Sequence, residues 1–146
     1  MKSRVMKTYS RLPVSFSHGQ GPYLYDTKGR RYLDGLCGIS VTNLGHAHPA
    51  VTHAIKKQAE SLLHTSNLYE IDRQELLASQ LADIAGMDSI FFANSGAEAN
   101  EAAIKLARMH GHQRGFKNPE IIVLDGAFHG RTLATLSATD GDKIQE

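Results

Sequence analysis

The sequence has little of several features that would mark a particular class of protein. Cys37 is the only cysteine among its 146 residues, which excludes an internal disulfide and suits a reducing compartment. The 16 lysines and arginines nearly balance the 15 aspartates and glutamates, and no long basic cluster marks a surface for nucleic acid or anionic membrane. No segment has the apolar length of a signal peptide core or a membrane span. We therefore expect a cytoplasmic protein that binds neither nucleic acid nor membrane.

Common ligand signatures are also missing. The sequence contains no Gly-x-x-x-x-Gly-Lys-Ser/Thr motif, and the third position after Gly19–Gly21 is Leu24 instead of glycine. This excludes a P-loop nucleotide site and an ordinary Rossmann dinucleotide site. No cluster of carboxylates or cysteines accompanies the two histidine pairs, so we expect no metal site; these pairs are His46 with His48 and His110 with His112.

The residues that are present predict a soluble globular α/β protein. The chain is 41% hydrophobic and 21% charged, a composition that suits a protein with one hydrophobic core. Alternating residues in "GPYLYDTKGRRYLDG" predict a β-hairpin with its turn at residues 26–29. Apolar spacing, Pro49 at a helix start and Gly86 at a helix end predict further elements: helices over 50–64, 72–86 and 95–111, a short helix within 127–139, and strands over 90–93 and 120–126.

The order strand, helix, strand after residue 89 indicates the type of sheet. Both predicted strands are continuous apolar runs, which is typical of a buried parallel sheet with helices on its faces. A doubly wound sheet needs more strands than this chain supplies, so we expect an incomplete, mainly parallel sheet with flanking helices, the front part of a longer protein.

The stretch "FFANSGAEANEAAIKLAR" predicts a phosphate site. Ser95 and Glu98 have the spacing of a capping box, which starts a helix at Ser95, with Glu98 reaching back to the N-cap amide. The N–H groups of Gly96 and Ala97 then lie at the positive end of the helix dipole, and the missing glycine side chain leaves room for an anion. Close packing of small residues on the sheet is an equally good explanation of this motif alone.

The loop "DGAFHGRT", residues 125–132, follows the second predicted strand and is expected at the same edge of the sheet. Phe128 supplies a flat ring that can stack on a flat ligand, and the guanidinium of Arg131 can bind a carboxylate through two parallel hydrogen bonds. Alone, Phe128 is more typical of a core and Arg131 of a surface. Their combination with the Ser95–Ala97 turn favours a ligand site.

These residues carry a family resemblance. "FFANSGAEANEAAIKLAR" and "FHGRTLATLSATD" resemble the class III pyridoxal-phosphate-dependent aminotransferases. "YSRLPVSFSHGQGPYLYDTKGRRYLDGLCGISVTNLGHAHP" is similar to their acetylornithine aminotransferase branch. The resemblance implies the N-terminal portion of a fold-type I homodimer: residues 1–60 as a hairpin and helix of the small domain, and residues 61–146 as the opening, truncated part of the large cofactor domain. "HTSNLY", residues 64–69, resembles a segment at the dimer interface near the active site.

The resemblance also implies residue roles. Ser95, Gly96 and Ala97 match the turn that binds the cofactor phosphate, Phe128 matches the aromatic residue that stacks on the pyridine ring, and Arg131 matches the arginine that binds a substrate carboxylate. None of the lysines lies in a context that resembles the Schiff-base lysine of the family, so we expect no catalytic residue in this chain and no activity from it alone.

Three interpretations of function remain open. The first is transamination of N2-acetyl-L-ornithine with 2-oxoglutarate in arginine biosynthesis, with succinyldiaminopimelate in lysine biosynthesis as a further substrate, carried out by a longer enzyme. The second is another class III aminotransferase, acting on ornithine, succinylornithine or 4-aminobutyrate. The third is a truncated, non-catalytic remnant.

Overall fold

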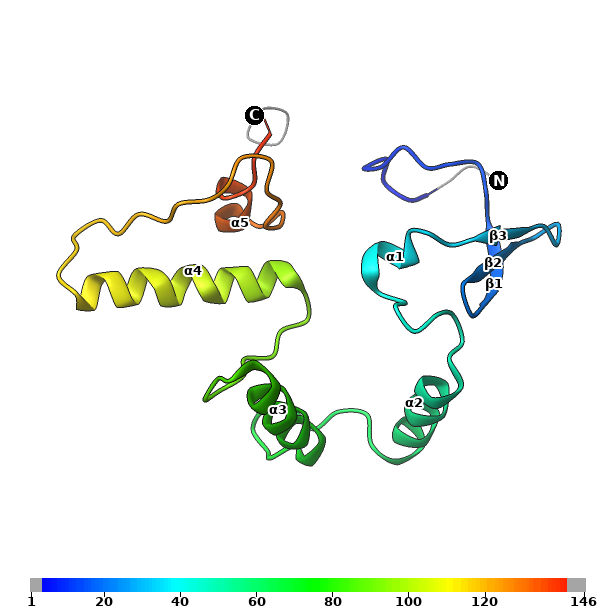
Figure 1. Ribbon diagram of the computed structural model, residues 1–146, viewed down its shortest axis with the longest axis horizontal. Helices are drawn as coiled ribbons and strands as arrows, with labels where there is room; N and C mark the ends of the chain where they lie inside the picture. Colours follow the sequence, from blue (N-terminus) through cyan, green and yellow to red (C-terminus); the bar gives the residue numbers. More distant parts are fainter. Residues whose placement is uncertain (1–3, 142–146) are drawn as a thin grey trace. The chain divides into compact units, whose positions relative to one another are not determined.

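The computed structural model describes residues 4–141. Its contacts divide the described chain into two compact units, one up to Glu70 and one from Ile71 onward. Figure 1 follows the chain through both units by colour. The division reflects contacts within these 146 residues, so the predicted domains, residues 1–60 and 61–146, stay a prediction.

The first unit contains a three-stranded antiparallel sheet. Its strands are β1 (Phe16–Gln20), β2 (Tyr23–Asp26) and β3 (Arg31–Leu33), in the order β1-β2-β3. The predicted hairpin is therefore confirmed as β2 and β3. Strand β1 was not predicted from the sequence.

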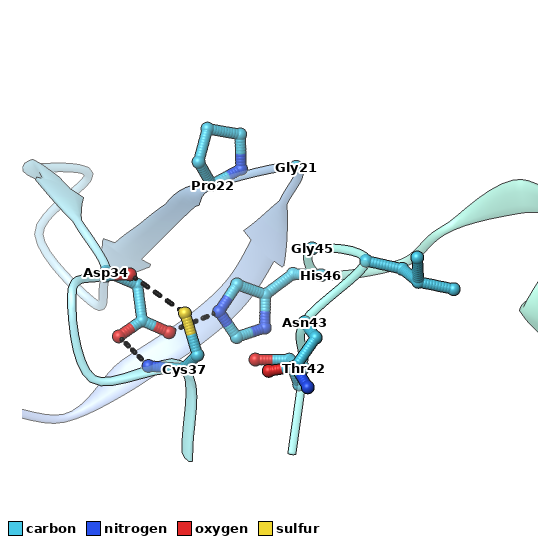
Figure 2. A pocket seen from close by; sticks show the side chains of 9 residues that line it. Gly21, Pro22, Asp34, Cys37, Thr42, Asn43, Gly45 and His46 are labelled. Carbon is cyan, nitrogen blue, oxygen red and sulfur yellow. Dashed lines mark hydrogen bonds and ion pairs between the residues drawn. The ribbon is translucent and has the colours of Figure 1, made fainter. Parts of the chain in front are cut away.

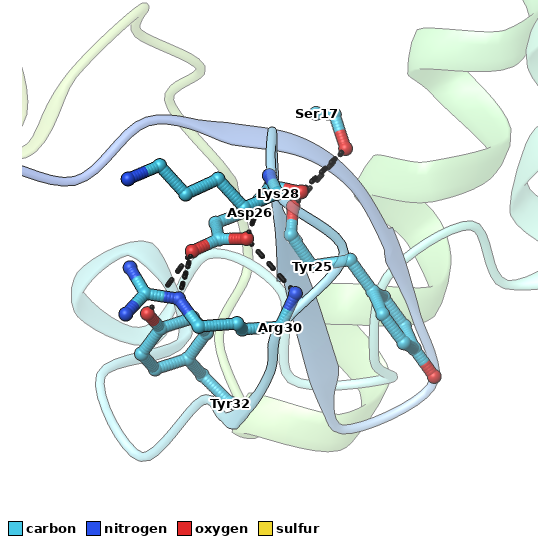
Figure 3. A network of polar contacts seen from close by, with 6 residues as sticks. All are labelled: Ser17, Tyr25, Asp26, Lys28, Arg30 and Tyr32. Carbon is cyan, nitrogen blue, oxygen red and sulfur yellow. Dashed lines mark hydrogen bonds and ion pairs between the residues drawn. The ribbon is translucent and has the colours of Figure 1, made fainter.

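The turn between β2 and β3 is organised by Asp26, whose side chain is only 4% exposed (Figure 3). Its Oδ1 accepts hydrogen bonds from the backbone N–H groups of Lys28 and Arg30, each at 2.9 Å, and its Oδ2 accepts from Arg30 Nε at 2.7 Å and Tyr32 OH at 3.2 Å. Burial by itself would raise the pKa of Asp26, but the hydrogen bonds from Arg30, Lys28 and Tyr32 outweigh it and lower the pKa to about 2. A buried carboxylate thus closes the hairpin.

A second carboxylate ties the segment after the hairpin to the sheet (Figure 2). Asp34 Oδ2 lies 2.7 Å from His46 Nε2, and Asp34 Oδ1 accepts from the backbone N–H of Cys37 at 2.9 Å. The bond to His46 is the largest cause of a lowered pKa at Asp34. His46 also exchanges two backbone hydrogen bonds with Gly21. Between Asp34 and His46, α1 (Cys37–Ser40) is a single turn whose backbone is left-handed at Gly38 and Ile39.

The next two helices are close to their predicted bounds. Helix α2 (Pro49–Ser61) has proline in its first turn, as expected, and ends before Leu62, which is extended. Helix α3 (Asp72–Ala85) ends at Gly86 in the left-handed conformation, φ 63°, because glycine adopts that conformation without a steric penalty. Both predictions are confirmed, apart from the last residues of the first helix.

The second unit contains α3 and two further helices, α4 (Gly96–Gln113) and α5 (Leu133–Ser137) (Figure 1). Helices α4 and α5 contact each other. Both were predicted. The predicted strands over 90–93 and 120–126 are not assigned as strands within residues 4–141. The parallel pairing predicted for them is therefore not formed in this part of the chain, where the sheet described is the antiparallel β1–β3. A run of apolar residues indicates burial but does not supply the hydrogen-bonded neighbour that makes a strand.

The expected hydrophobic core is also absent from residues 4–141, where no hydrophobic side chain is buried. Ile122 is 96% exposed and Leu133 is 87% exposed, because the apolar faces of these segments have no layer packed against them. The side chains that are fully buried are Thr135 and Thr139. None of the helices described is both long and apolar enough to cross a membrane.

Candidate functional site

The site begins at the N-terminus of α4, where Ser95 is the N-cap as predicted. Ser95 is extended, φ −152° and ψ 159°, and its Oγ accepts from the backbone N–H of Glu98 at 3.3 Å. The predicted return contact of Glu98 is wrong by one residue, because Glu98 Oε2 accepts from the N–H of Asn94 at 2.6 Å and not from that of Ser95. The extended N-cap brings the amide of the preceding residue within reach of the glutamate. Glu98 therefore fixes the chain entering the helix.

Gly96 and Ala97 are the first two residues of α4. Their N–H groups precede the first intrahelical bond and lie at the positive end of an 18-residue helix. Gly96 is exposed, and a Cβ added to it would meet no atom within 4 Å. The first turn thus offers two backbone donors beside open space, which is the arrangement that binds an anionic oxygen.

Gly130 brings the second predicted motif to this turn. A Cβ added to Gly130 would lie 2.8 Å from Ala97 Cβ and 2.6 Å from Thr135 Oγ1, and the residue has a φ of 133°. Only glycine permits both the conformation and the approach. The Ser95–Ala97 turn and the Phe128–Arg131 loop, more than 30 residues apart in the chain, are therefore in contact, as the sequence analysis expected.

Side chains from α4 and from the segment after α5 hold this loop in place. Asn100 Nδ2 donates to the His129 carbonyl at 2.7 Å, and Thr139 Oγ1 accepts from the His129 N–H at 2.9 Å. Thr132 caps α5, contacts Glu101 through its hydroxyl, and places its Oγ1 2.7 Å from Thr135 Oγ1. The loop is thus fixed by hydrogen bonds, in a region without buried hydrophobic side chains.

The two predicted ligand-binding side chains are on the outside of this scaffold. The ring of Phe128 is 65% exposed, and Arg131 is exposed as well. An exposed ring on a loop that touches the turn with the backbone donors can stack on a planar ligand, and a guanidinium three residues further on can bind a carboxylate of a second molecule. The geometry is compatible with a planar, phosphorylated ligand and an acidic substrate.

Sequence reasoning missed several residues of this arrangement. It singled out neither Asn100 nor Thr139, and it did not pair Asp34 with His46. One available signal was Asn100 itself, because asparagine is a poor helix former and occurs here inside an alanine-rich helix. Among residues 4–141 no group of three or more histidine, cysteine, aspartate or glutamate side chains is arranged to hold a metal ion.

Comparison with known proteins assigns the family. The model of the family "Aminotransferase class-III" matches residues 5–146. The chain belongs to this family. It is 54% identical to acetylornithine aminotransferase 1 of Bordetella parapertussis over 146 residues, all of this chain and 37% of that protein. It is 52% identical to acetylornithine aminotransferase of Methanocaldococcus jannaschii over 142 residues, 97% of this chain and 36% of that protein. The chain therefore spans little more than a third of the length of these curated relatives.

Solved aminotransferases have the same fold over this length. An ornithine aminotransferase from Toxoplasma gondii ME49 matches with a TM-score of 0.90 and 31% identity, over 97% of this chain and 34% of that one. N-acetylornithine aminotransferase from Stenotrophomonas maltophilia K279a matches with a TM-score of 0.76 and 37% identity, over 84% of this chain and 34% of that one. The predicted fold class, an α/β portion of a pyridoxal-phosphate-dependent aminotransferase, is confirmed by these matches.

Class III aminotransferases depend on pyridoxal 5'-phosphate, and the Toxoplasma enzyme has been solved with this cofactor at partial occupancy in its active site. The residues of the present chain fit such a group. The open space at Gly96 has room for the phosphate, the free end of α4 has the donors and dipole to hold it, and the exposed ring of Phe128 lies on a loop that touches the same turn.

Proposed function

We propose that this chain supplies the phosphate-binding turn and part of the substrate site of an acetylornithine aminotransferase, which transfers an amino group from N2-acetyl-L-ornithine to 2-oxoglutarate in arginine biosynthesis. The observation that carries the proposal is the contact between Gly130 and Ala97, which joins the two motifs that the chemistry needs. The choice of donor rests on the relatives named acetylornithine aminotransferase. Succinyldiaminopimelate, an acylated substrate of lysine biosynthesis, is a further donor under this proposal.

Each site residue has one task in this proposal. The N–H groups of Gly96 and Ala97 would hold the phosphate, with Ser95 fixing the start of the helix so that they point outward. Phe128 would cover one face of the pyridine ring, and Arg131 would bind the carboxylate of each substrate in turn. When bound, pyridoxal phosphate withdraws electrons from the substrate carbon that loses a proton, which permits exchange of the amino group. This chain's contribution is therefore to bind and orient.

A second candidate is another class III aminotransferase, and because the chain is similar to an ornithine aminotransferase we take ornithine as the first alternative donor. Succinylornithine and 4-aminobutyrate are the other donors that we consider. A non-catalytic remnant is the third candidate, and the absence of a lysine in the family's Schiff-base context supports inactivity of the 146 residues alone.

The test is a substrate panel with the full-length gene product that carries these residues. Pyridoxal phosphate binding and kcat/KM are measured for N2-acetylornithine, succinyldiaminopimelate, ornithine, succinylornithine and 4-aminobutyrate, each with 2-oxoglutarate. We expect the largest kcat/KM for N2-acetylornithine. A larger value for ornithine or 4-aminobutyrate would support the second candidate, and a product that binds no cofactor and transfers no amino group would support the third.

The proposal extends to assembly and location. We expect a cytoplasmic homodimer, with residues 64–69 at the subunit interface near the active site, as the family resemblance implies. Sedimentation equilibrium of the full-length gene product measures the subunit number, and a monomer with full activity would contradict this part of the proposal.

A further inference from the structure

Both backbone polar groups of His129, the residue between Phe128 and Gly130, are held by side chains. The carbonyl accepts from Asn100 Nδ2 at 2.7 Å, and the N–H donates to Thr139 Oγ1 at 2.9 Å. The hydroxyl of Thr139, which is 1% exposed, also lies 3.2 Å from the Gly130 carbonyl. Side-chain hydrogen bonds thus hold consecutive peptide groups between Phe128 and Arg131, the residues proposed to stack on the ring and to bind the carboxylate.

One of these hydrogen bonds comes from Asn100 in α4, the helix whose first turn is the proposed phosphate site. Asn100 lies four residues after Gly96 in α4, one helical turn further on, and Gly130 packs against Ala97. One rigid helix therefore holds the proposed phosphate donors at its first turn and, through Asn100, the backbone of the loop. The two parts of the site are joined by the Asn100–His129 hydrogen bond, by the packing of Gly130 on Ala97, and by the contact of Thr132 with Glu101 of the same helix.

We propose that Asn100 is a positioning residue: it fixes the loop that carries Phe128 and Arg131 relative to the Gly96–Ala97 turn, so that cofactor phosphate and substrate carboxylate are held at one set distance. This inference rests on the proposed function. Its physical basis is that a misplacement of about 1 Å at a reacting centre can cost about a hundredfold in rate. An amide at position 100 donates to the His129 carbonyl, whereas a carboxylate would place acceptor against acceptor.

The variants separate positioning of the loop from stability of the helix. Asn100→Ala removes the donor, and Asn100→Asp keeps the size of the side chain but not the donor, so it serves if the alanine variant does not fold. Thr139→Val removes the hydroxyl that accepts from the His129 N–H, with little change in shape, whereas Thr139→Ser retains this hydroxyl. Asn118→Asp, at an exposed position, is the control for the added charge. All are made in the full-length gene product.

Two measurements are needed. The rate of hydrogen exchange in the peptide covering residues 127–132 reports how firmly the loop is held by its hydrogen bonds, and it does not depend on catalysis. We expect exchange about tenfold faster in Asn100→Ala, Asn100→Asp and Thr139→Val, because the loop opens locally when one of these hydrogen bonds is lost. The rate should be unchanged in Thr139→Ser and Asn118→Asp. The same rate in Asn100→Ala, Asn100→Asp and wild type would overturn the inference whatever the protein's function.

The second measurement compares kcat/KM for the two substrates with the Kd of inorganic phosphate, which probes the N-terminus of α4. In both Asn100 variants we expect kcat/KM for N2-acetylornithine and for 2-oxoglutarate to fall about tenfold, while the Kd of inorganic phosphate for the cofactor-free protein stays within about twofold. Unchanged kcat/KM, or a phosphate affinity that falls as much as kcat/KM, would overturn the positioning role. A wild-type protein without transamination would instead count against the proposed function, and the exchange rates would still decide whether Asn100 holds the loop.

Discussion

Arg131 is the residue whose role depends most on the shape of its side chain. If it binds a substrate carboxylate in both half-reactions, Arg131→Lys keeps the charge but loses the two-pronged contact. Loss of one charge-assisted hydrogen bond costs about 1.5 to 3 kcal/mol, so kcat/KM for N2-acetylornithine and for 2-oxoglutarate should each fall about ten- to a hundredfold. The Kd of pyridoxal phosphate should change little. Unchanged specificity constants, or an equal loss of cofactor affinity, would exclude the carboxylate role.

Gly96 allows stability and ligand binding to be separated at one position. Its Cβ position is open and its φ is not in the left-handed region, so Gly96→Ala should not lower the thermal midpoint, because alanine favours helix by up to about 1 kcal/mol. The added methyl group would occupy the space in front of the first amides, and we expect phosphate and pyridoxal phosphate to bind about tenfold more weakly or worse. Gly35→Ala, where the Cβ also meets no atom, is the control and should change neither property. Full cofactor affinity in Gly96→Ala would contradict the phosphate role.

At the scale of an element, the β2–β3 turn depends on an ionised Asp26. The pKa of Asp26 is lowered from 3.8 to about 2 in the folded protein, so the stabilisation is complete above pH 4 and is lost as the pH falls through 2. Asp26→Asn should therefore be less stable than wild type at pH 7, and the difference should shrink between about pH 4 and pH 2. The measurement is the urea midpoint of the full-length gene product against pH.

The control for this turn is Asp83→Asn, a change at an exposed position on α3. Hydrogen exchange of the Lys28 and Arg30 amides, both bonded to Asp26, localises the effect to the turn. A stability difference between wild type and Asp26→Asn that stays constant from pH 6 to pH 2 would show that the charge of Asp26 contributes nothing.

At the scale of the whole molecule, the exposed apolar surface governs behaviour in solution. Residues 4–141 bury no hydrophobic side chain, and large apolar residues such as Leu68, 87% exposed, and Leu124, 79% exposed, face solvent in both units. The 146 residues produced alone should therefore self-associate or form a loose, partly helical state. Analytical ultracentrifugation and thermal circular dichroism test this. A monodisperse monomer with one cooperative transition would contradict it.

Local features of this protein were determined by the sequence. Ser95 caps α4, Gly86 ends α3, and the hairpin turns at residues 26–29, because each depends on the conformational preferences and hydrogen bonds of residues a few positions apart. Residue motifs also predicted a ligand site at Gly96, Ala97 and the 128–131 loop, and the close approach of Gly130 to Ala97 brings these two segments together.

Only the tertiary structure decided which distant residues meet. The hydrogen bond from Asn100 to His129 spans 29 positions and the Asp34–His46 pair spans 12, and no local pattern encodes either partner. The same limit explains the error at residues 90–93 and 120–126, where the apolar pattern indicated burial but could not name a partner strand. Such contacts depend on how the chain closes in space, because a side chain selects its partner by position and geometry and not by separation in sequence.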